Sequence, residues 1–252
     1  MAKIKVLSVE DSFPWRSINL SSMHLERHTI RKNENWRSDN EYELLFLSGA
    51  QKELFTFIGW DNRAYPPNRV EQTGLLAGKH YENTVSGKRF CVVHHVLPIS
   101  DAKGSSAYIE YSAEMMHKAI VQLDEMERGQ KDPCELLGWF HTHPNGLPTF
   151  MSSTDMITQR GVFNSEHNYS VVLNPHTLSW KAFRGCNADD AECRWLNVDT
   201  VEALCTKEAV STLVTTDTKS SNDVQSAKKK KKKGNWKKRK AKIQRRRVAK
   251  RR

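Results

Sequence analysis

One stretch, residues 135–155, constrains the fold of this chain more than any other. It opens with an apolar run of strand length that is rich in aromatic residues, Glu135-Leu-Leu-Gly-Trp-Phe. His141 and His143 follow directly, with one residue between them. Because residues two apart on a strand point to the same face, we expect both imidazole rings on one side of the strand's end and Thr142 on the other.

A third metal-binding side chain comes soon after the histidines. Asp155 lies beyond a short loop, about one helical turn into a further element. Two imidazoles and one carboxylate supply three nitrogen and oxygen ligands without an evident fourth. Structural zinc sites use four protein ligands, whereas catalytic zinc sites leave a position for water. The pattern therefore indicates a catalytic zinc site.

Each piece of this pattern also has a simpler explanation. Two histidines on a strand are more often structural than metal-binding. A serine three residues before an aspartate, as in Ser152 and Asp155, is typical of a capping box, whose hydroxyl and carboxylate satisfy the first amides of a helix. Glu71 alone is an ordinary surface glutamate. Only the arrangement of all these residues in one chain favours catalysis.

The chain divides into four regions by composition. Residues 1–40 are polar and form either an N-terminal extension or a small lobe. Residues 41–205 carry strand and helix patterns and form the main domain. Residues 206–227 are rich in Ser, Thr, Asp and Lys, which predicts a linker. Residues 228–252 hold 17 Lys and Arg and no acidic residue, which predicts a disordered basic tail.

The patterned region predicts a compact domain of the α/β or α+β class. Apolar runs bounded by turn residues predict strands over 42–47, 73–78, 89–97, 134–142, 169–173 and 178–183. Amphipathic or capped segments predict helices over 51–60, 112–128, from Ser152 or Ser153 onward, and over 192–209.

The order of the motifs resembles the signature of a known family. The stretch Gly138-Trp-Phe-His-Thr-His-Pro, followed by a loop and Ser152-x-x-Asp155, is similar to the signature of the JAMM zinc metalloproteases, also named MPN-plus or JAB. That family carries a glutamate well upstream, before a Gly-Leu strand, which Glu71 matches here. The resemblance covers about residues 42–185. It implies a mixed β-sheet flanked by helices, as in JAMM and cytidine-deaminase-like folds, and one Zn²⁺ per chain.

The resemblance also gives each residue of the motif a role. His141, His143 and Asp155 match the zinc ligands. Glu71 matches the general base, which takes a proton from the attacking water and passes it to the leaving amine. Ser152 matches the hydroxyl that hydrogen-bonds the developing oxyanion. Zinc at such a site lowers the pKa of water to roughly 7 and polarises the scissile carbonyl.

The loop between the ligands departs from the family pattern. Eleven residues separate His143 from Asp155, one more than the family usually has. Asn145-Gly146 and Pro148 place the extra residue in the loop, where insertions are tolerated. The departure affects the shape of the substrate rim more than the ligand set.

The substrate that the family implies is a ubiquitin-like modifier. The chain would be a zinc-dependent (iso)peptidase that cuts after the modifier's C-terminal glycine, in deconjugation or in precursor processing. The compact domain is similar to prokaryotic JAB-type, deubiquitinase-like peptidases, some of which act in bacterial conjugation systems linked to antiphage defence. Two alternatives stay open. One is a JAB peptidase that acts on sulfur-carrier proteins, and the other is a nucleic-acid-associated protein that uses the JAMM domain as a scaffold.

The basic tail motivates the last alternative. Its 17 cations leave residues 1–227 with −6 of the chain's net charge of +11. A run of cations this dense could bind nucleic acid or another acidic partner through residues 228–252. A solubilising, sorting or nuclear-localisation tail explains the same composition.

Composition also bears on the location of the protein. No run approaches the roughly 18 apolar residues of a membrane span, and the apolar run at the N-terminus is too short for a signal peptide. The cysteines are odd in number, are scattered and form no CxxC pair. We therefore expect reduced thiols and a cytoplasmic protein, or a nuclear one in a eukaryote, rather than a second metal site among the cysteines. The cysteines are Cys91, Cys134, Cys186, Cys193 and Cys205.

Two further motifs favour simpler roles. His94-His95 lies in a strand pattern, and adjacent strand residues face opposite sides, so we expect no ligand role for this pair. Pro133-Cys134 is similar to part of the zinc-deaminase motif. The second cysteine and the HxE element are missing, which disfavours a deaminase.

Overall fold

The computed structural model describes residues 15–33, 42–60, 70–100, 103–104, 109–110 and 113–205. All of these residues belong to one compact unit. The regions that the sequence predicts as linker and basic tail lie outside the described residues, and so does the expected helix N-cap at residue 112.

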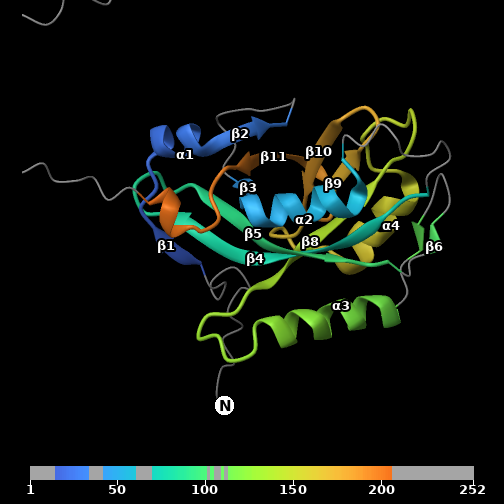
Figure 1. Cartoon of the computed structure of the whole chain (residues 1–252), viewed down its shortest axis with the longest axis horizontal. Helices are drawn as coiled ribbons and strands as arrows, with labels where there is room; N and C mark the ends of the chain where they lie inside the picture. The colour runs from blue at the N-terminus through green and yellow to red at the C-terminus, as the bar shows by residue number, and fades with distance from the viewer. Residues whose placement is uncertain are drawn as a thin grey trace, which may run out of the picture. The chain divides into compact units, whose positions relative to one another are not determined.

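A mixed β-sheet forms the centre of the described structure (Figure 1). Its strands run in the order β1-β4-β5-β3-β11-β10-β9-β8, β2 adds to β11, and β8 pairs back with β4, so that the sheet closes on itself. The strands are β1 (Arg16–Ile18), β2 (Thr29–Lys32), β3 (Tyr42–Phe46), β4 (Thr73–Asn83), β5 (Arg89–Pro98), β8 (Glu135–Thr142), β9 (Tyr169–Asn174), β10 (Ser179–Arg184) and β11 (Asp189–Leu196). A separate two-stranded sheet joins β6 (Lys103–Gly104) and β7 (Ile109–Glu110).

Four α-helices flank the sheet within the described residues, together with a short 3-10 turn, η2 (Glu202–Leu204). They are α1 (Ser22–His28), α2 (Ser48–Ile58), α3 (Ala113–Met126) and α4 (Ser153–Val162). The fold is therefore mixed α/β, as the sequence predicts. None of the described helices is both long and apolar enough to span a membrane.

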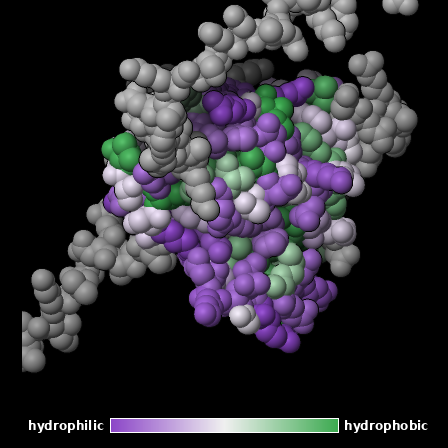
Figure 2. Space-filling view, turned by 60° about the vertical axis from the view of Figure 1, so that its left-hand side comes forward, coloured by the Kyte–Doolittle hydropathy of each residue, from purple (hydrophilic) through white to green (hydrophobic). Residues whose placement is uncertain are grey.

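The two main helices cover opposite sides of the sheet (Figure 1). On α2, Ala50, Leu54 and Ile58 recur every four residues and pack into the largest core cluster, and the helix ends at Gly59, whose φ of 61° is left-handed. On α3, Leu123 and its apolar neighbours pack against β4, β5 and β8 in another cluster. The face seen in Figure 2 is largely hydrophilic, with hydrophobic side chains in small separate patches.

Strand β8 contains an irregularity at Gly138. The β4–β8 register shifts between Leu76 and Ala77, where Gly138 is the partner of Leu76. The φ of Gly138 is 152°, and a Cβ atom there would lie 1.8 Å from the carbonyl oxygen of Tyr169 on β9. Only glycine permits this backbone conformation and this close approach.

The shift changes which face of β8 meets which helix. Leu136 and Trp139 are three residues apart, yet both pack in the cluster on the α3 side. Leu137 and Phe140 pack together in the cluster on the α2 side. In a regular strand, residues three apart would point to opposite faces.

The N-terminal region contributes to the sheet. Strand β1 pairs in parallel with β4, and β2 pairs antiparallel with β11. Residues 15–33, within the region assigned from the sequence to an N-terminal extension or small lobe, thus supply two strands of the central sheet. Their few apolar residues, such as Leu20 and Leu25, are buried against Phe90 and Leu196.

The helix predicted over residues 192–209 is wrong for the part that the structure describes, residues 192–205. Residues 192–196 belong to strand β11, and residues 202–204 form the 3-10 turn η2. On β11, Cys193 and Trp195 face the core beside α2, whereas Arg194 is buried on the other face by ion pairing with Glu43. Apolar and polar residues alternate over 191–195, which is a strand pattern that the sequence analysis overlooked, although both faces are buried.

Candidate metal centre

Three elements bring the predicted site residues together. His141 is the next-to-last residue of β8, and His143 follows the strand directly. Asp155 is the third residue of α4. Glu71 precedes β4, whose first residue, Thr73, lies opposite His141 in the β4–β8 ladder. The pairing of these two strands therefore places a residue about 70 positions upstream beside the histidines.

The histidines and the aspartate converge on one point. The Nε2 atoms of His141 and His143 lie 3.3 Å apart. The Oδ2 atom of Asp155 lies 3.3 Å from the first nitrogen and 3.7 Å from the second. All three residues are buried. In the part of the chain that the structure describes, this is one of two groups of side chains that could hold a metal ion.

Neighbouring groups fix the orientation of each ring. The Nδ1–H of His143 donates to the carbonyl oxygen of Pro148 at 2.6 Å, which leaves the Nε2 lone pair facing the site. His141 stacks on Trp139 with 4.6 Å between ring centroids. The indole Nε1 of Trp139 donates to Gln159 at 2.8 Å. The sequence analysis missed Trp139 and Gln159, although Trp139 stands two residues before His141 and thus shares its face.

The loop that carries Pro148 also meets the rings. Phe150 lies edge-on to His143 with 5.2 Å between ring centroids. Asn174 donates to the carbonyl oxygens of Asn145 and Leu147, at 3.1 and 2.7 Å, and thereby fastens the loop to the end of β9. The loop with the extra residue is therefore anchored at both a strand end and a histidine.

The capping box expected at the start of α4 is present. The Oγ atom of Ser152 accepts from the Asp155 N–H at 3.2 Å, and the Ser152 N–H donates to Asp155 Oδ2 at 2.7 Å. The same carboxylate oxygen faces both histidine rings. The capping and metal-binding interpretations are therefore compatible, because the cap orients the carboxylate toward the rings.

The pKa values of these groups are shifted strongly. Burial lowers the pKa of His141. Burial acts to raise the pKa of Asp155, but the hydrogen bonds with His141 and His143 outweigh it and hold the pKa well below its usual range. A carboxylate that stays ionised beside a neutral imidazole is the state in which both can ligate a metal.

The pKa of Glu71 shifts in the opposite direction from that of Asp155. Its exposed fraction is 4%, and burial raises the pKa of its carboxyl group to about 7. The positive charge on His143 opposes this shift, and the negative charge on Asp155 adds to it. No hydrogen bond within the described residues ends on this carboxylate. Glu71 is thus poised to gain or lose a proton near neutral pH.

The donor set fits Zn²⁺. Two imidazole nitrogens lie 3.3 Å apart, and one carboxylate oxygen lies within 3.7 Å of both, so a single cation could accept a lone pair from all three atoms. Two nitrogens and one oxygen are ligands that zinc takes in catalytic sites.

Comparison with known families agrees with this geometry. Residues 61–166 match the family model described as JAB1/Mov34/MPN/PAD-1 ubiquitin protease. This match supports the JAB/MPN family. The matched JAB segment contains Glu71, His141, His143, Ser152 and Asp155, and the strands and helix that position them. No curated protein matches the chain.

Proposed function

We propose that this chain is a zinc-dependent (iso)peptidase that hydrolyses the bond after the C-terminal glycine of a ubiquitin-like modifier. A JAB/MPN domain suggests isopeptidase or peptidase-like activity at the level of the family. The observation that carries the proposal is the convergence of His141, His143 and Asp155 beside the buried carboxyl group of Glu71.

The three converging side chains would hold one Zn²⁺. When bound, the ion supplies Lewis-acid chemistry, in that it makes water more acidic, with a pKa of roughly 7, and polarises a carbonyl group. The chain itself contributes rigid ligands: Pro148 holds the ring of His143, Trp139 stacks on the ring of His141, and the α4 cap holds Asp155.

Glu71 would move the proton. Its carboxylate accepts a proton from the attacking water and then delivers it to the nitrogen of the leaving amine. A pKa of about 7 suits both steps, because the group can be deprotonated before the reaction and protonated during it. Burial also keeps bulk water from exchanging this proton.

Ser152 would stabilise the oxyanion. Its oxygen already accepts the Asp155 N–H, so its own hydroxyl proton remains available as a donor. A donor of this kind acts on the charge that develops on the scissile carbonyl oxygen. One side chain therefore serves both the helix cap and the reaction.

Exposed apolar side chains next to the site support an extended peptide substrate. Val70, which precedes Glu71, is 51% exposed, and Phe150, which contacts His143, is 46% exposed. Such side chains can pack against a modifier's C-terminal segment as it leads into the site. A sulfur-carrier protein with a similar terminus is the alternative substrate.

The substrate class is tested by cleavage of three matched fusions with the full-length chain. The fusions carry ubiquitin, a bacterial ubiquitin-like protein or a sulfur carrier ahead of the same reporter. We expect chelator-sensitive cleavage after the terminal glycine of a ubiquitin-like fusion. Cleavage of the sulfur-carrier fusion alone would assign the alternative substrate, and cleavage of none would overturn the proposal.

The role of Glu71 is tested by Glu71→Ala. We expect this variant to lose cleavage while it retains stoichiometric zinc, because Glu71 is not among the converging ligands. Glu114→Ala on α3 is the matched control, since Glu114 is exposed and pairs with Lys118 on its own helix. Normal turnover by Glu71→Ala would show that the role given to Glu71 is wrong.

We place this activity in the cytoplasm, because the five cysteines are unpaired. A bacterial conjugation system linked to antiphage defence is the setting that we propose. Genes for an activating enzyme, a conjugating enzyme and a ubiquitin-like protein next to this gene would support that setting, and their absence would argue against it.

We further propose that residues 228–252 recruit nucleic acid or another acidic partner. Seventeen cations without an acid in this stretch support an electrostatic contact that does not depend on the catalytic residues. In this proposal the basic stretch is accessory to the peptidase, rather than evidence for a scaffold without activity.

A further inference from the structure

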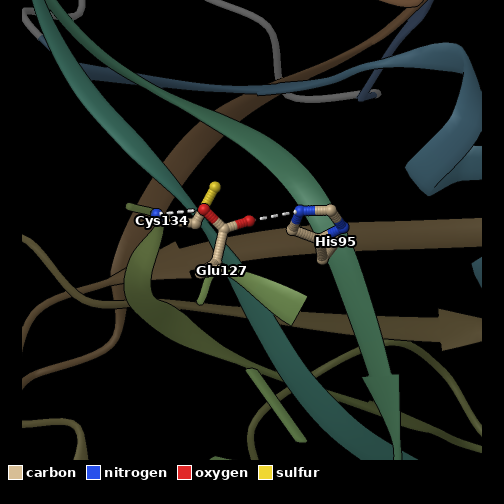
Figure 3. Close-up of side chains that lie close together, drawn as sticks. All are labelled: His95, Glu127 and Cys134. Carbon is tan, nitrogen blue, oxygen red and sulfur yellow. Dashed lines mark hydrogen bonds and ion pairs between the residues drawn. The ribbon is translucent and has the colours of Figure 1, made fainter. Parts of the chain in front are cut away.

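A second group of metal-binding side chains lies at the other end of β8. His95 is on β5, Glu127 follows α3, and Cys134 precedes β8. One ligand atom from each of the three residues lies within 4.8 Å of those of the other two. Figure 3 shows Glu127 between the other two side chains. The sequence analysis expected no ligand role for His95 and treated Cys134 as a free thiol.

Strand pairing explains how these residues meet. In the antiparallel pairs, Ala77 of β4 lies opposite His95 of β5 on one side and opposite Leu136 of β8 on the other. Cys134 stands two residues before Leu136 in the chain. His95 and Cys134 therefore lie on either side of β4, about two strand spacings apart. Glu127, the first residue after α3, completes the group through its contacts with His95 and the Cys134 N–H.

The carboxylate of Glu127 is held in place by its neighbours. Its Oε1 lies 2.9 Å from the Nε2 of His95, and its Oε2 accepts the Cys134 N–H at 2.9 Å. The side chains of His95 and Glu127 are 28% and 12% exposed, and Cys134 is buried. The group is therefore preorganised, yet open enough on the His95 side for an ion to enter.

We propose that His95, Glu127 and Cys134 bind a second divalent ion, Zn²⁺, which is distinct from the ion of the candidate metal centre. One nitrogen, one oxygen and one sulfur make a ligand set that suits zinc, whereas calcium and magnesium require oxygen ligands. Six residues of β8 lie between Cys134 and His141, which corresponds to a separation of roughly 20 Å. The two sites cannot share one ion.

The charges around the group allow a cation to bind. A cation there would pair with the Glu127 carboxylate and with the Cys134 thiolate that forms when the metal displaces the thiol proton. Lys79, the neighbouring cation, already pairs with Asp132 at 3.2 Å, so its charge is compensated.

The ion would join three segments that are distant in sequence. It would fasten the end of α3 to β5 and to the start of β8. Helix α3 leaves Ile120, Val121 and Met126 more than a third exposed, so its apolar packing on the sheet is incomplete. A metal link at its C-terminal end adds stability where hydrophobic burial is limited.

Cobalt substitution tests the proposal with a readout that does not depend on activity. The full-length chain is stripped with chelator, reduced, and titrated with Co²⁺ or Zn²⁺. A thiolate ligand to Co²⁺ gives a charge-transfer absorption in the near ultraviolet, which the candidate metal centre cannot give because it contains no sulfur. We expect this absorption and about two zinc ions per chain.

Variants assign the signal to residues. Cys134→Ser should lose the absorption and one equivalent of zinc, and His95→Gln, which changes a partly exposed side chain, should lose the same equivalent. His143→Ala should keep the absorption, and Cys186→Ser, which removes an exposed free thiol, should leave both readouts unchanged.

Other outcomes overturn the proposal. One zinc per chain without the absorption would mean that the three side chains form only a hydrogen-bonded cluster. An absorption that survives Cys134→Ser and disappears in Cys186→Ser would mean binding by the exposed thiol alone. Either result leaves the proposed peptidase activity intact, because that activity depends on the other group of ligands.

Discussion

Glu71 and Glu127 are both largely buried glutamates beside a histidine, and their pKa values move in opposite directions. Burial raises the pKa of Glu71 to about 7. Burial also acts to raise the pKa of Glu127, but the hydrogen bonds from the Cys134 N–H and from His95 outweigh it and lower the pKa. What differs is the number of donors that the fold supplies to each carboxylate. A carboxylate without donors can exchange a proton, whereas one with donors is fixed as an anion.

Exchanging each glutamate for glutamine separates these two roles most sharply. We expect Glu71→Gln to lower kcat by about 10² to 10⁴-fold, because glutamine cannot take up the proton of the attacking water. We expect Glu127→Gln to change kcat by less than about twofold, since Glu127 lies at the far end of β8 from the reaction. Steady-state cleavage of a ubiquitin-like fusion measures both.

Zinc content completes this pair of variants. Glu71→Gln should bind as much zinc as the wild type, and Glu127→Gln should bind less. The assignment of separate roles to the two glutamates is wrong if Glu127→Gln loses turnover as completely as Glu71→Gln, since the two sites would then act as one.

Ser152→Ala should have the next largest effect. Loss of an oxyanion donor lowers kcat by about 10² to 10³-fold. The same change removes the side-chain acceptor of the α4 cap and should cost about 1 kcal/mol of stability. Cleavage kinetics and urea unfolding measure the two effects separately. Ser153→Ala, at the next position, is the control and should change neither. A stability loss without a change in kcat would leave Ser152 with the capping role alone.

The two glutamates should also give opposite pH dependences of stability in the metal-free protein. Because the folded-state pKa of Glu71 is raised, the wild type loses stability as the pH rises from about 4.5 through about 7, whereas Glu71→Gln does not. Between these two pH values, the free energy of unfolding of Glu71→Gln should therefore rise relative to that of the wild type by up to about 3 kcal/mol. Urea unfolding at a series of pH values measures the difference.

Glu127 should affect the pH dependence of stability in the opposite direction. Its pKa is lowered in the folded protein, so its stabilising contribution is present above the unfolded pKa of about 4.5 and is lost as the pH falls below that value. Glu127→Gln should thus be less stable than the wild type at neutral pH, and the gap should close in acid. Parallel pH profiles for the two variants would contradict the contrast between the carboxylates.

The smallest effect on catalysis is expected from deletion of residues 228–252. Turnover of a small fusion substrate should stay within about twofold of the wild type, because these residues carry charge and no catalytic group. Nucleic-acid binding, measured by fluorescence anisotropy at several salt concentrations, should be lost. If neither the full chain nor the shortened chain cleaves any fusion, the scaffold interpretation gains instead.

Much of the fold and one of the two clusters could be predicted from the sequence. His141, His143 and Asp155 stand within a short stretch, so strand alternation and helix capping bring them together without knowledge of long-range pairing. Glu71 reaches them only through the β4–β8 ladder, which residue spacing does not reveal. Its place near the histidines was expected from the family resemblance rather than from local pattern.

The second cluster could not be predicted, for a physical reason. His95, Glu127 and Cys134 come from a strand, a helix end and a loop end, and the register of β4 with its two neighbours brings them together. This error arises where tertiary contacts, rather than local preference, decide the environment of a residue. Strand β11 is a different kind of error, since the alternation of apolar and polar residues over 191–195 was present in the sequence and predicts a strand.

At Gly138 the alternation of side chains between the two faces of β8 shifts by one residue. Before it, even-numbered residues such as Leu136 face α3; after it, odd-numbered residues such as Trp139 do. Straightening the strand at this glycine without removing a residue would restore uniform parity and turn His141 toward the α2 side while Cys134 kept its place. A homologous protein with a regular strand here would therefore need one residue fewer between Cys134 and His141 to keep its imidazoles on the side of α4.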